Sequence, residues 1–205
     1  MFRELPRAGT PLGWSDLATF GCGEKFEATF ARWLPARYVY IVSSGRAALY
    51  LILKALRELS KRTELVIPAY TCPIVPLAIA RAGLTVRLCD ISPQTGNLDL
   101  EPLEEVVMDR TLAIVPVHMN GIPCDMAAIL AVAQRHGTFV IEDCAQAAGA
   151  TLNGERVGTF GDFAFFSLGR GKGFSVYEGG IIVCQAGEYA ELIQAQIEET
   201  LRFSS

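Results

Sequence analysis

Short apolar runs alternate along the chain with segments of helical pattern, and this alternation restricts the possible folds more than any other feature. Most runs are continuously apolar, which is typical of strands covered on both faces. The strand candidates are Tyr38–Val42, Leu65–Ala69, Thr85–Cys89, Leu112–Val117, Thr138–Ile141, Phe163–Phe166 and Gly180–Cys184. The helix candidates are Arg46–Leu59, Pro73–Ala82, Leu103–Met108, Met126–His136 and Glu188–Leu201. The pattern predicts an α/β three-layer sandwich with a mostly parallel seven-stranded sheet.

The composition is that of a chain with a substantial hydrophobic core. The 205 residues are 51% hydrophobic and 20% charged, which suits one fairly large domain. The net charge of −4 gives no indication of a nucleic-acid or acidic-membrane partner. No apolar run approaches membrane-spanning length, and the N-terminus lacks the apolar core of a signal peptide. We therefore expect a soluble, cytoplasmic protein.

The N-terminal segment differs from the rest of the chain. Residues 1–35 are irregular and contain several prolines and glycines, so we predict an N-terminal arm followed by one domain over residues 36–205. The six cysteines form no C-x-x-C pair and indicate thiols in a reducing compartment. Two histidines, His118 and His136, are too few and too far apart for a histidine metal site, so we expect no metal.

Polar and small residues gather where several apolar strands end. Ligands of open α/β sheets bind beyond the carboxyl ends of the strands. The segments at such positions are Ser43–Arg46, Pro68–Cys72, Glu142–Gln146 and Ser167–Gly173. We expect them to converge on one site.

Asp143 and Lys172 lie in two of these segments and suggest a cofactor. An aldehyde cofactor with a ring nitrogen requires a lysine that forms an imine and an acid that keeps the nitrogen protonated, which points to pyridoxal phosphate. The alternatives are a structural acid that accepts backbone N–H groups and a solvated loop lysine. A phosphate-binding P-loop fails, because it needs Gly at Phe166 and Ser or Thr at Gly173. Glu142 should point to the opposite face of the strand from Asp143.

Other polar residues at the strand ends allow two interpretations each. The segment Ser43–Arg46 joins a strand to a helix, where free N–H groups would hold a phosphate, or Ser44 is an ordinary N-cap. Ser167 is a candidate phosphate ligand or a turn residue. His118 lines the same cleft or is structural. Cys72 has no obvious histidine partner that would make it a nucleophile.

Six ordered motifs resemble the DegT/DnrJ/StrS sugar aminotransferases, which are fold-type I enzymes that use pyridoxal phosphate. They are S-G-R-A-A-L, I-P-A-Y-T-C, T-L-A-I-V-P-V-H-M-N-G, V-I-E-D-C-A-Q-A-A-G-A, G-T-F-G-D-F-A-F-F-S and a lysine loop that ends in Y-E-G-G. The resemblance runs from about Tyr38 to Cys184. It implies that Lys172 binds the cofactor covalently and that Asp143 pairs with the pyridine nitrogen. It further implies roles for Gln146 near the ring hydroxyl, for Ser167, Gly45 and Arg46 around the phosphate, and for Cys72 at the ring-stacking position.

The chain also departs from the family pattern. Arg46 replaces the usual Thr or Ser, and Cys72 replaces the usual aromatic residue. The C-terminal small domain of the family is absent from residues 1–205, so we expect a pyridoxal-phosphate-binding large domain that is truncated.

The resemblance implies a reaction for the full-length form. It implies amino transfer from an amino acid, by resemblance glutamate, to a keto-sugar that is typically nucleotide-linked, in a homodimer. Some relatives are dehydratases that have lost the lysine, so Lys172 favours amino transfer. The alternative is a truncated or degenerate non-catalytic member that acts as a cofactor-binding or interaction module.

Overall fold

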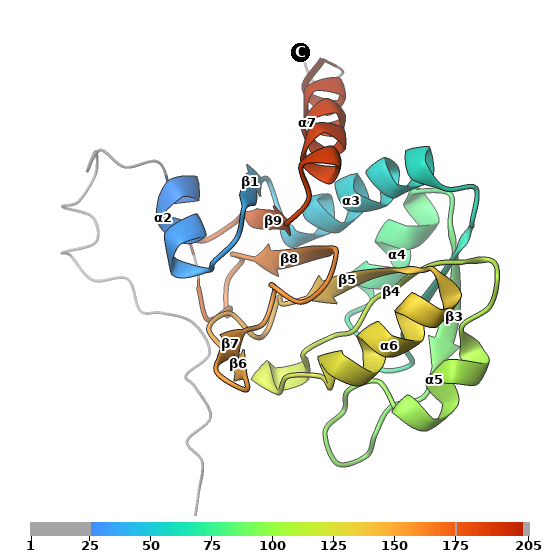
Figure 1. Ribbon diagram of the computed structural model, residues 1–205. Coiled ribbons are helices and arrows are strands. Elements are labelled where there is room, and N and C mark those ends of the chain that lie inside the picture. Colours follow the sequence, from blue (N-terminus) through green and yellow to red (C-terminus); the bar gives the residue numbers. More distant parts are fainter. Residues whose placement is uncertain (1–25, 175, 203–205) are drawn as a thin grey trace, which may run out of the picture.

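A seven-stranded sheet forms the centre of the computed structural model, which describes residues 26–174 and 176–202 (Figure 1). The strand order is β1-β9-β8-β5-β4-β2-β3. The strands are β1 (Tyr38–Val42), β2 (Glu64–Pro68), β3 (Thr85–Cys89), β4 (Thr111–Ile114), β5 (Phe139–Asp143), β8 (Phe163–Ser167) and β9 (Gly180–Cys184). Only β9 is antiparallel to its neighbours in this sheet. The predicted α/β class with a mostly parallel seven-stranded sheet is confirmed.

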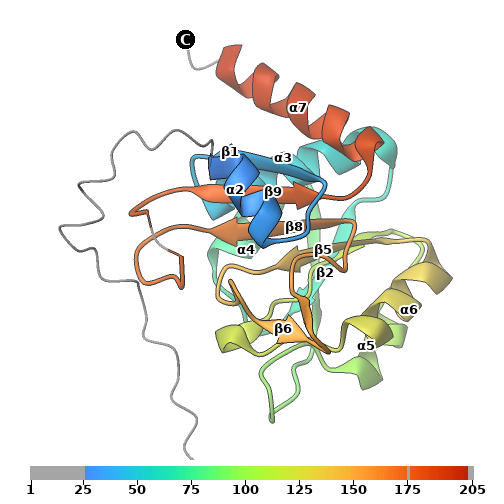
Figure 2. The same cartoon turned by 60° about the vertical axis from the view of Figure 1, so that its left-hand side comes forward.

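Helices lie on both faces of the sheet (Figures 1 and 2). One face packs against α3, α4 and the first turns of α7, and the other against α5, α6 and α2. The helices are α2 (Phe26–Trp33), α3 (Gly45–Leu59), α4 (Ile74–Arg81), α5 (Leu100–Val106), α6 (Met126–His136) and α7 (Gly187–Arg202). A 3-10 turn spans Met119–Gly121, and a small hairpin consists of β6 (Thr151–Leu152) and β7 (Glu155–Arg156). The resulting layers bury β4 and β9 completely, as their continuous apolar sequences predict.

The N-terminal part of the described chain corrects one prediction. Phe26–Trp33 was expected to be irregular and is helical, because Phe30 is buried and packs edge-on against Phe166 at 5.3 Å between ring centroids. Residues 1–25 of the predicted arm lie outside the described residues. Packing of an aromatic residue against the sheet therefore overrides the loop-like composition.

Two further differences have local causes. The expected strand Leu112–Val117 ends at Ile114, because Pro116 has no N–H to continue the ladder. The hairpin β6–β7 was missed, although its turn is an Asn153-Gly154 pair with positive φ values of 52° and 88°. Asn-Gly is the preferred pair for a two-residue hairpin turn.

Cap positions at the helix ends follow the sequence closely. Ser44 accepts a hydrogen bond from the N–H of Ala47, and Asp125 accepts one from Ala128. Gly137 ends α6 in a left-handed conformation with φ of 56°. The N-cap interpretation of Ser44 is confirmed.

Two observations concern the cysteines and membrane-spanning helices. Outside Cys22, which is not described, the cysteines are unpaired thiols, and only Cys72 among them is exposed. Across residues 26–174 and 176–202, no helix has both the length and the apolar character needed to cross a bilayer.

Arg62 joins β4 to the end of α6. Its Nη1 donates to the carbonyl oxygens of Thr111 at 3.1 Å, His136 at 3.0 Å and Gly137 at 2.8 Å. The last carbonyl groups of a helix have no partner within the helix, so this guanidinium satisfies them from outside.

Replacing Arg62 by methionine should therefore weaken the fold. Arg62→Met keeps much of the aliphatic length but removes the donor, and we expect the free energy of unfolding to fall by about 2 kcal/mol. Urea denaturation followed by circular dichroism measures the change. Lys61→Met is the matched control at the exposed neighbouring position. Equal stability of the two variants would contradict the capping role.

Candidate functional site

One cavity of about 220 Å³ lies where the ends of β1, β2, β5 and β8 meet. All seven residues predicted from the sequence to form the site line this cavity: Gly45, Arg46, Cys72, Asp143, Gln146, Ser167 and Lys172. The apolar part of the wall consists of Leu49, Val75, Val117 and Phe165, among other residues. The four segments singled out in the sequence therefore converge on one cavity, as expected.

The start of α3 presents free backbone donors to the cavity. The side chain of Ser44 caps the helix by accepting from Ala47, at 3.1 Å between Oγ and N. This leaves the N–H groups of Gly45 and Arg46 without an acceptor inside the helix. Two free N–H groups at the positive end of a helix dipole form a favourable place for an anion.

Two glycines allow the start of α3 to lie directly against the sheet. A Cβ atom on Gly45 would lie 3.0 Å from Cβ of Ser167, at the end of β8. A Cβ atom on Gly180 would lie 2.3 Å from the carbonyl carbon and oxygen of Ser44. Any side chain at Gly180 would thus displace the Ser44–Gly45 peptide. Gly180 is a structural determinant of the site that the sequence analysis did not identify.

Asp143 is a buried acid with little support from the protein. It is 4% exposed, and its Oδ1 accepts a hydrogen bond from the N–H of Ala145 at 2.9 Å. Burial raises the pKa of Asp143 to about 6, although the Ala145 N–H and the positive charge of Lys172 act in the opposite direction. A desolvated acid that faces a cavity and destabilises the fold when ionised is typical of a functional group.

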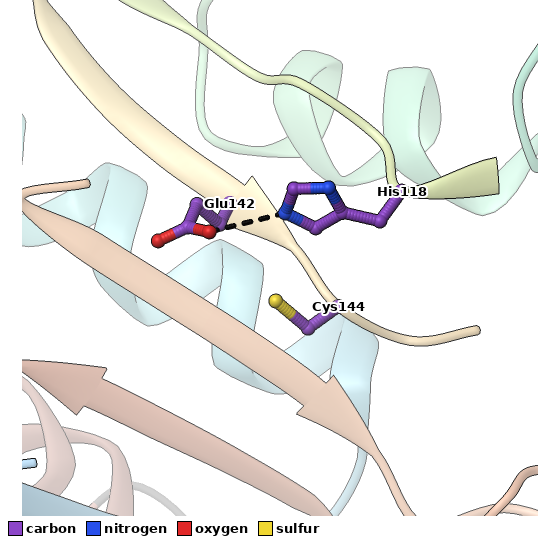
Figure 3. Close-up of side chains that lie close together, drawn as sticks. All are labelled: His118, Glu142 and Cys144. Atoms are coloured by element: carbon purple, nitrogen blue, oxygen red, sulfur yellow. Dashed lines mark hydrogen bonds and ion pairs between the residues drawn. The ribbon is translucent and has the colours of Figure 1, made fainter. Parts of the chain in front are cut away.

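Glu142 is a structural acid that accepts backbone N–H groups, which was the alternative role considered for Asp143. It points to the opposite face of β5, as the strand alternation predicts, and its side chain is fully buried. Its two carboxylate oxygens accept from the N–H groups of Gly158, Phe160 and Gly161 at 2.8 Å each, and contact Nε2 of His118 at 3.0 Å. Figure 3 shows the contact with His118.

His118 does not line the cavity, so the structural alternative applies to it. The ring is fully buried and lies between Glu142 and the N–H of Cys124, which donates to Nδ1 at 3.0 Å. Since Nδ1 accepts a hydrogen bond, the proton of the neutral ring belongs on Nε2, from which it points to Glu142.

Lys172 reaches the cavity from a turn that follows β8. Its backbone N–H donates to the carbonyl of Gly169 at 3.2 Å, and Gly171 has a positive φ of 77°. The lysine is half-buried. The guanidinium of Arg170, two residues before Lys172, lies 3.9 Å from the ring centroid of Tyr177.

Thr71 also lines the cavity; it belongs to the predicted segment Pro68–Cys72 but was not named individually as a site residue. Its Oγ1 is buried and is the one such side-chain polar atom within the described ranges that has no hydrogen-bond partner. A buried hydroxyl without a partner is unfavourable, and a bound ligand would satisfy it. Its position directly before Cys72, after the end of β2, was the available signal. Tyr70, two residues before Cys72, is 64% exposed and does not line the cavity.

Gln146 lies at the outer edge of the cavity. Its Oε1 accepts a hydrogen bond from the N–H of Asn120 at 3.3 Å, and its Nε2 lies 3.6 Å from Sδ of Met119. The 3-10 turn after β4 thus holds the amide of Gln146 beside the cavity, where it is exposed.

Comparison with known proteins assigns the chain to a family. Residues 16–201 match the model of the DegT/DnrJ/EryC1/StrS aminotransferase family. The chain belongs to this family. Its members bind pyridoxal phosphate.

The relatives of this chain are substantially longer than the chain itself. The spore coat polysaccharide biosynthesis protein SpsC of Bacillus subtilis is 39% identical over 83% of this chain and 44% of its own length. GDP-perosamine synthase of Caulobacter vibrioides is 38% identical over 81% and 44%, respectively. The X-ray structure of an aminotransferase from Psychrobacter cryohalolentis superposes with a TM-score of 0.79 at 34% identity, over 83% of this chain and 43% of that one. The chain spans less than half the length of these relatives.

Because the Asp143 carboxylate is buried, we expect Asp143→Asn to raise the free energy of unfolding by an amount that depends on pH. The raised pKa means that the folded state binds more protons than the unfolded state between pH 4 and pH 6, so the carboxylate loses stability as the pH rises through this window. The asparagine still accepts from Ala145 but never ionises. In the cofactor-free chain we expect the variant to gain about 3 kcal/mol relative to the wild type between pH 4 and pH 7.

Urea unfolding of both proteins at several pH values measures this difference. The difference should be small near pH 4 and reach its full value above pH 6. A difference that does not change with pH would contradict the assignment of a destabilising buried carboxylate at Asp143.

Proposed function

We propose that this chain forms the cofactor-binding part of a pyridoxal-phosphate-dependent aminotransferase that transfers an amino group from an amino acid to a keto-sugar. The observation that carries the proposal is the meeting of Lys172, Asp143 and the start of α3 in one cavity. An amine, a buried acid and an anion-binding helix end are the three groups that this cofactor needs from a protein.

The residues of the cavity fit pyridoxal phosphate. The N–H groups of Gly45 and Arg46 offer donors to a phosphate, and Ser167, whose Cβ lies against Gly45, also lines the cavity with its hydroxyl-bearing side chain. The unpartnered Oγ1 of Thr71 adds a buried hydroxyl that requires a ligand. Asp143 on the sheet side supplies an acid for the ring nitrogen. Arg46, in the first turn of α3, also lines the cavity and brings a positive side chain to this part of the site.

Each proposed role follows from the position of the side chain. When bound, the cofactor supplies an aldehyde that takes up the donor's amino group and a ring that withdraws electrons from the reacting carbon. Asp143 would hold a proton on the ring nitrogen. The amine of Lys172 would form the covalent bond to the cofactor and later move a proton as general base and acid. Gln146 would contact the cofactor at the edge of the ring, and Cys72 would lie against the face of the ring.

The substrate class rests on the relatives rather than on the cavity. The name of GDP-perosamine synthase supports a nucleotide-linked sugar, and the name of SpsC supports a role in polysaccharide biosynthesis. We therefore propose a nucleotide-linked keto-sugar as acceptor and, by family resemblance, glutamate as donor and a homodimer as the active assembly.

Lysine labelling tests the proposal directly. Borohydride treatment of the chain with pyridoxal phosphate should fix a pyridoxyl group on Lys172, because this half-buried amine shares a cavity with the acid for the ring nitrogen. Peptide mapping is unambiguous, since the sequence has only Lys25, Lys54, Lys61 and Lys172. Lys172→Ala should reduce the label by more than about tenfold.

Lys61→Ala is the matched control, because Lys61 is exposed and lies before the start of β2, at the opposite end of that strand from the cavity. It should label like the wild type. Equal labelling of all four lysines, or full labelling of Lys172→Ala, would contradict the proposal and favour a non-catalytic module.

A further inference from the structure

Two acids stand side by side at the end of β5 and serve opposite faces of the sheet. The Asp143 side chain faces the cavity with one hydrogen bond from Ala145, whereas the Glu142 side chain lies on the opposite face with four donors around its carboxylate. Since the two residues share one peptide bond, the hydrogen bonds that hold the Glu142 side chain also restrain the backbone that carries Asp143. The unequal support of the two acids suggests that one holds the other in place.

The motif G-T-F-G-D explains how a loop comes so close to Glu142. A Cβ atom on Gly158 would lie 2.6 Å from the ring of Phe166, and one on Gly161 would lie 2.8 Å from the carbonyl oxygen of Val140. The absence of side chains at both positions lets three N–H groups of the loop point at one carboxylate. Asp162, at the end of the motif, accepts from the N–H of Val140 at 2.8 Å. The three N–H groups therefore form a clamp on Glu142 at the rear face of β5, whereas Asp162 binds β5 separately, at Val140.

His118 connects this clamp to Asp143 itself. Its Nε2 contacts the Glu142 carboxylate at 3.0 Å, and its backbone N–H donates to the carbonyl oxygen of Asp143 at 3.1 Å. The N–H of Asp143 in turn donates to the carbonyl of Pro116 at 2.8 Å. One residue thus contacts the side chain of Glu142 and the main chain of Asp143, from a segment that follows β4.

We propose that Glu142 and His118 are positioning residues, which fix the end of β5 from its rear face so that the Asp143 carboxylate keeps the orientation required by the cofactor's ring nitrogen. This inference rests on the proposed function for the role of Asp143. The rear-face contacts themselves are independent of any ligand.

A metal site is the competing explanation for the same cluster. The side chains of His118, Glu142 and Cys144 offer three ligand atoms within 4.8 Å of one another (Figure 3). The two ring nitrogens and both carboxylate oxygens already have protein partners. Burial raises the pKa of the Cys144 thiol well above its ordinary value, which keeps the thiol protonated and a poor ligand. The cluster therefore acts as a closed hydrogen-bond network.

Two substitutions separate the contacts of the His118 ring. An asparagine amide overlays the Nδ1 side of the imidazole, so His118→Asn keeps an acceptor for the Cys124 N–H and loses the donor to Glu142. A glutamine amide reaches the Nε2 position, so His118→Gln restores the donor to Glu142. Asp162→Ala is the control, because it removes another rear-face bond of β5, to Val140, without a link to Asp143.

Protonation of Asp143 in the cofactor-free chain provides the decisive signal. The amide of Ala145 donates to Oδ1 of Asp143, so its NMR shift follows the titration of that acid. We expect the midpoint to rise by about one pH unit in His118→Asn, since a misplaced carboxylate loses the Ala145 bond. It should return towards the wild-type value in His118→Gln and stay unchanged in Asp162→Ala. The ionisable groups that interact electrostatically with Asp143 are the amine of Lys172, the ring of His118 and the thiols of Cys124 and Cys144.

Cofactor affinity supplies the second readout. Spectroscopic titration with pyridoxal phosphate should show about a tenfold weaker affinity in His118→Asn and an unchanged affinity in Asp162→Ala. Midpoints and affinities that are the same in all variants, with only the unfolding temperature lowered, would overturn the inference and leave Glu142 and His118 with a purely structural role.

A measurement on the wild type covers the case in which His118→Asn does not fold. The ring ¹⁵N resonances of His118 should shift in step with the Ala145 amide as Asp143 titrates, and their independence would overturn the inference. A wild type that titrates in this coupled manner but takes no pyridoxyl label on Lys172 would refute the proposed function while supporting the positioning role.

Discussion

The buried Glu142 carboxylate is the interaction on which the rest of the site depends. Full burial of an acid is unfavourable unless hydrogen bonds replace the lost water, and here four donors surround the two oxygens. The donors come from the segment after β4 and from the loop before β8, the two strands that flank β5. The carboxylate therefore joins three adjacent strands behind the cavity.

The two faces of β5 differ in how well their polar groups are hydrogen-bonded. On the rear face every polar group of Glu142 is satisfied and contributes to stability, whereas on the cavity face Asp143 is desolvated and Thr71 has a buried hydroxyl without a partner. Strained or unsatisfied groups persist only where the surroundings stabilise the fold by other means. The hydrogen bonds of Glu142 on the rear face stabilise β5, and this stability offsets the unfavourable burial of Asp143 and Thr71 on the cavity side. Such a combination is typical of a ligand-binding site.

The sequence predicted the sheet well because continuous apolar runs report directly on burial. The bounds of β1, β3 and β9 agree with the prediction, and the seven site residues line one cavity because parallel strands bring their carboxyl ends to the same edge. The role of Glu142 was not predictable beyond its face, since its donors lie 16 to 19 residues further along the chain and in a histidine 24 residues before it. Gly180 was missed for the same reason: its close contact with Ser44 joins segments that are remote in sequence.

The central claim is that the strand-end cavity orients pyridoxal phosphate between Asp143 and the start of α3. A crystal structure of the chain with the bound cofactor tests it most directly. The account predicts the ring nitrogen at about 2.6–3.2 Å from the Asp143 carboxylate and the phosphate on the N–H groups of Gly45 and Arg46. A cofactor bound elsewhere, or one whose ring nitrogen points away from Asp143, would contradict it.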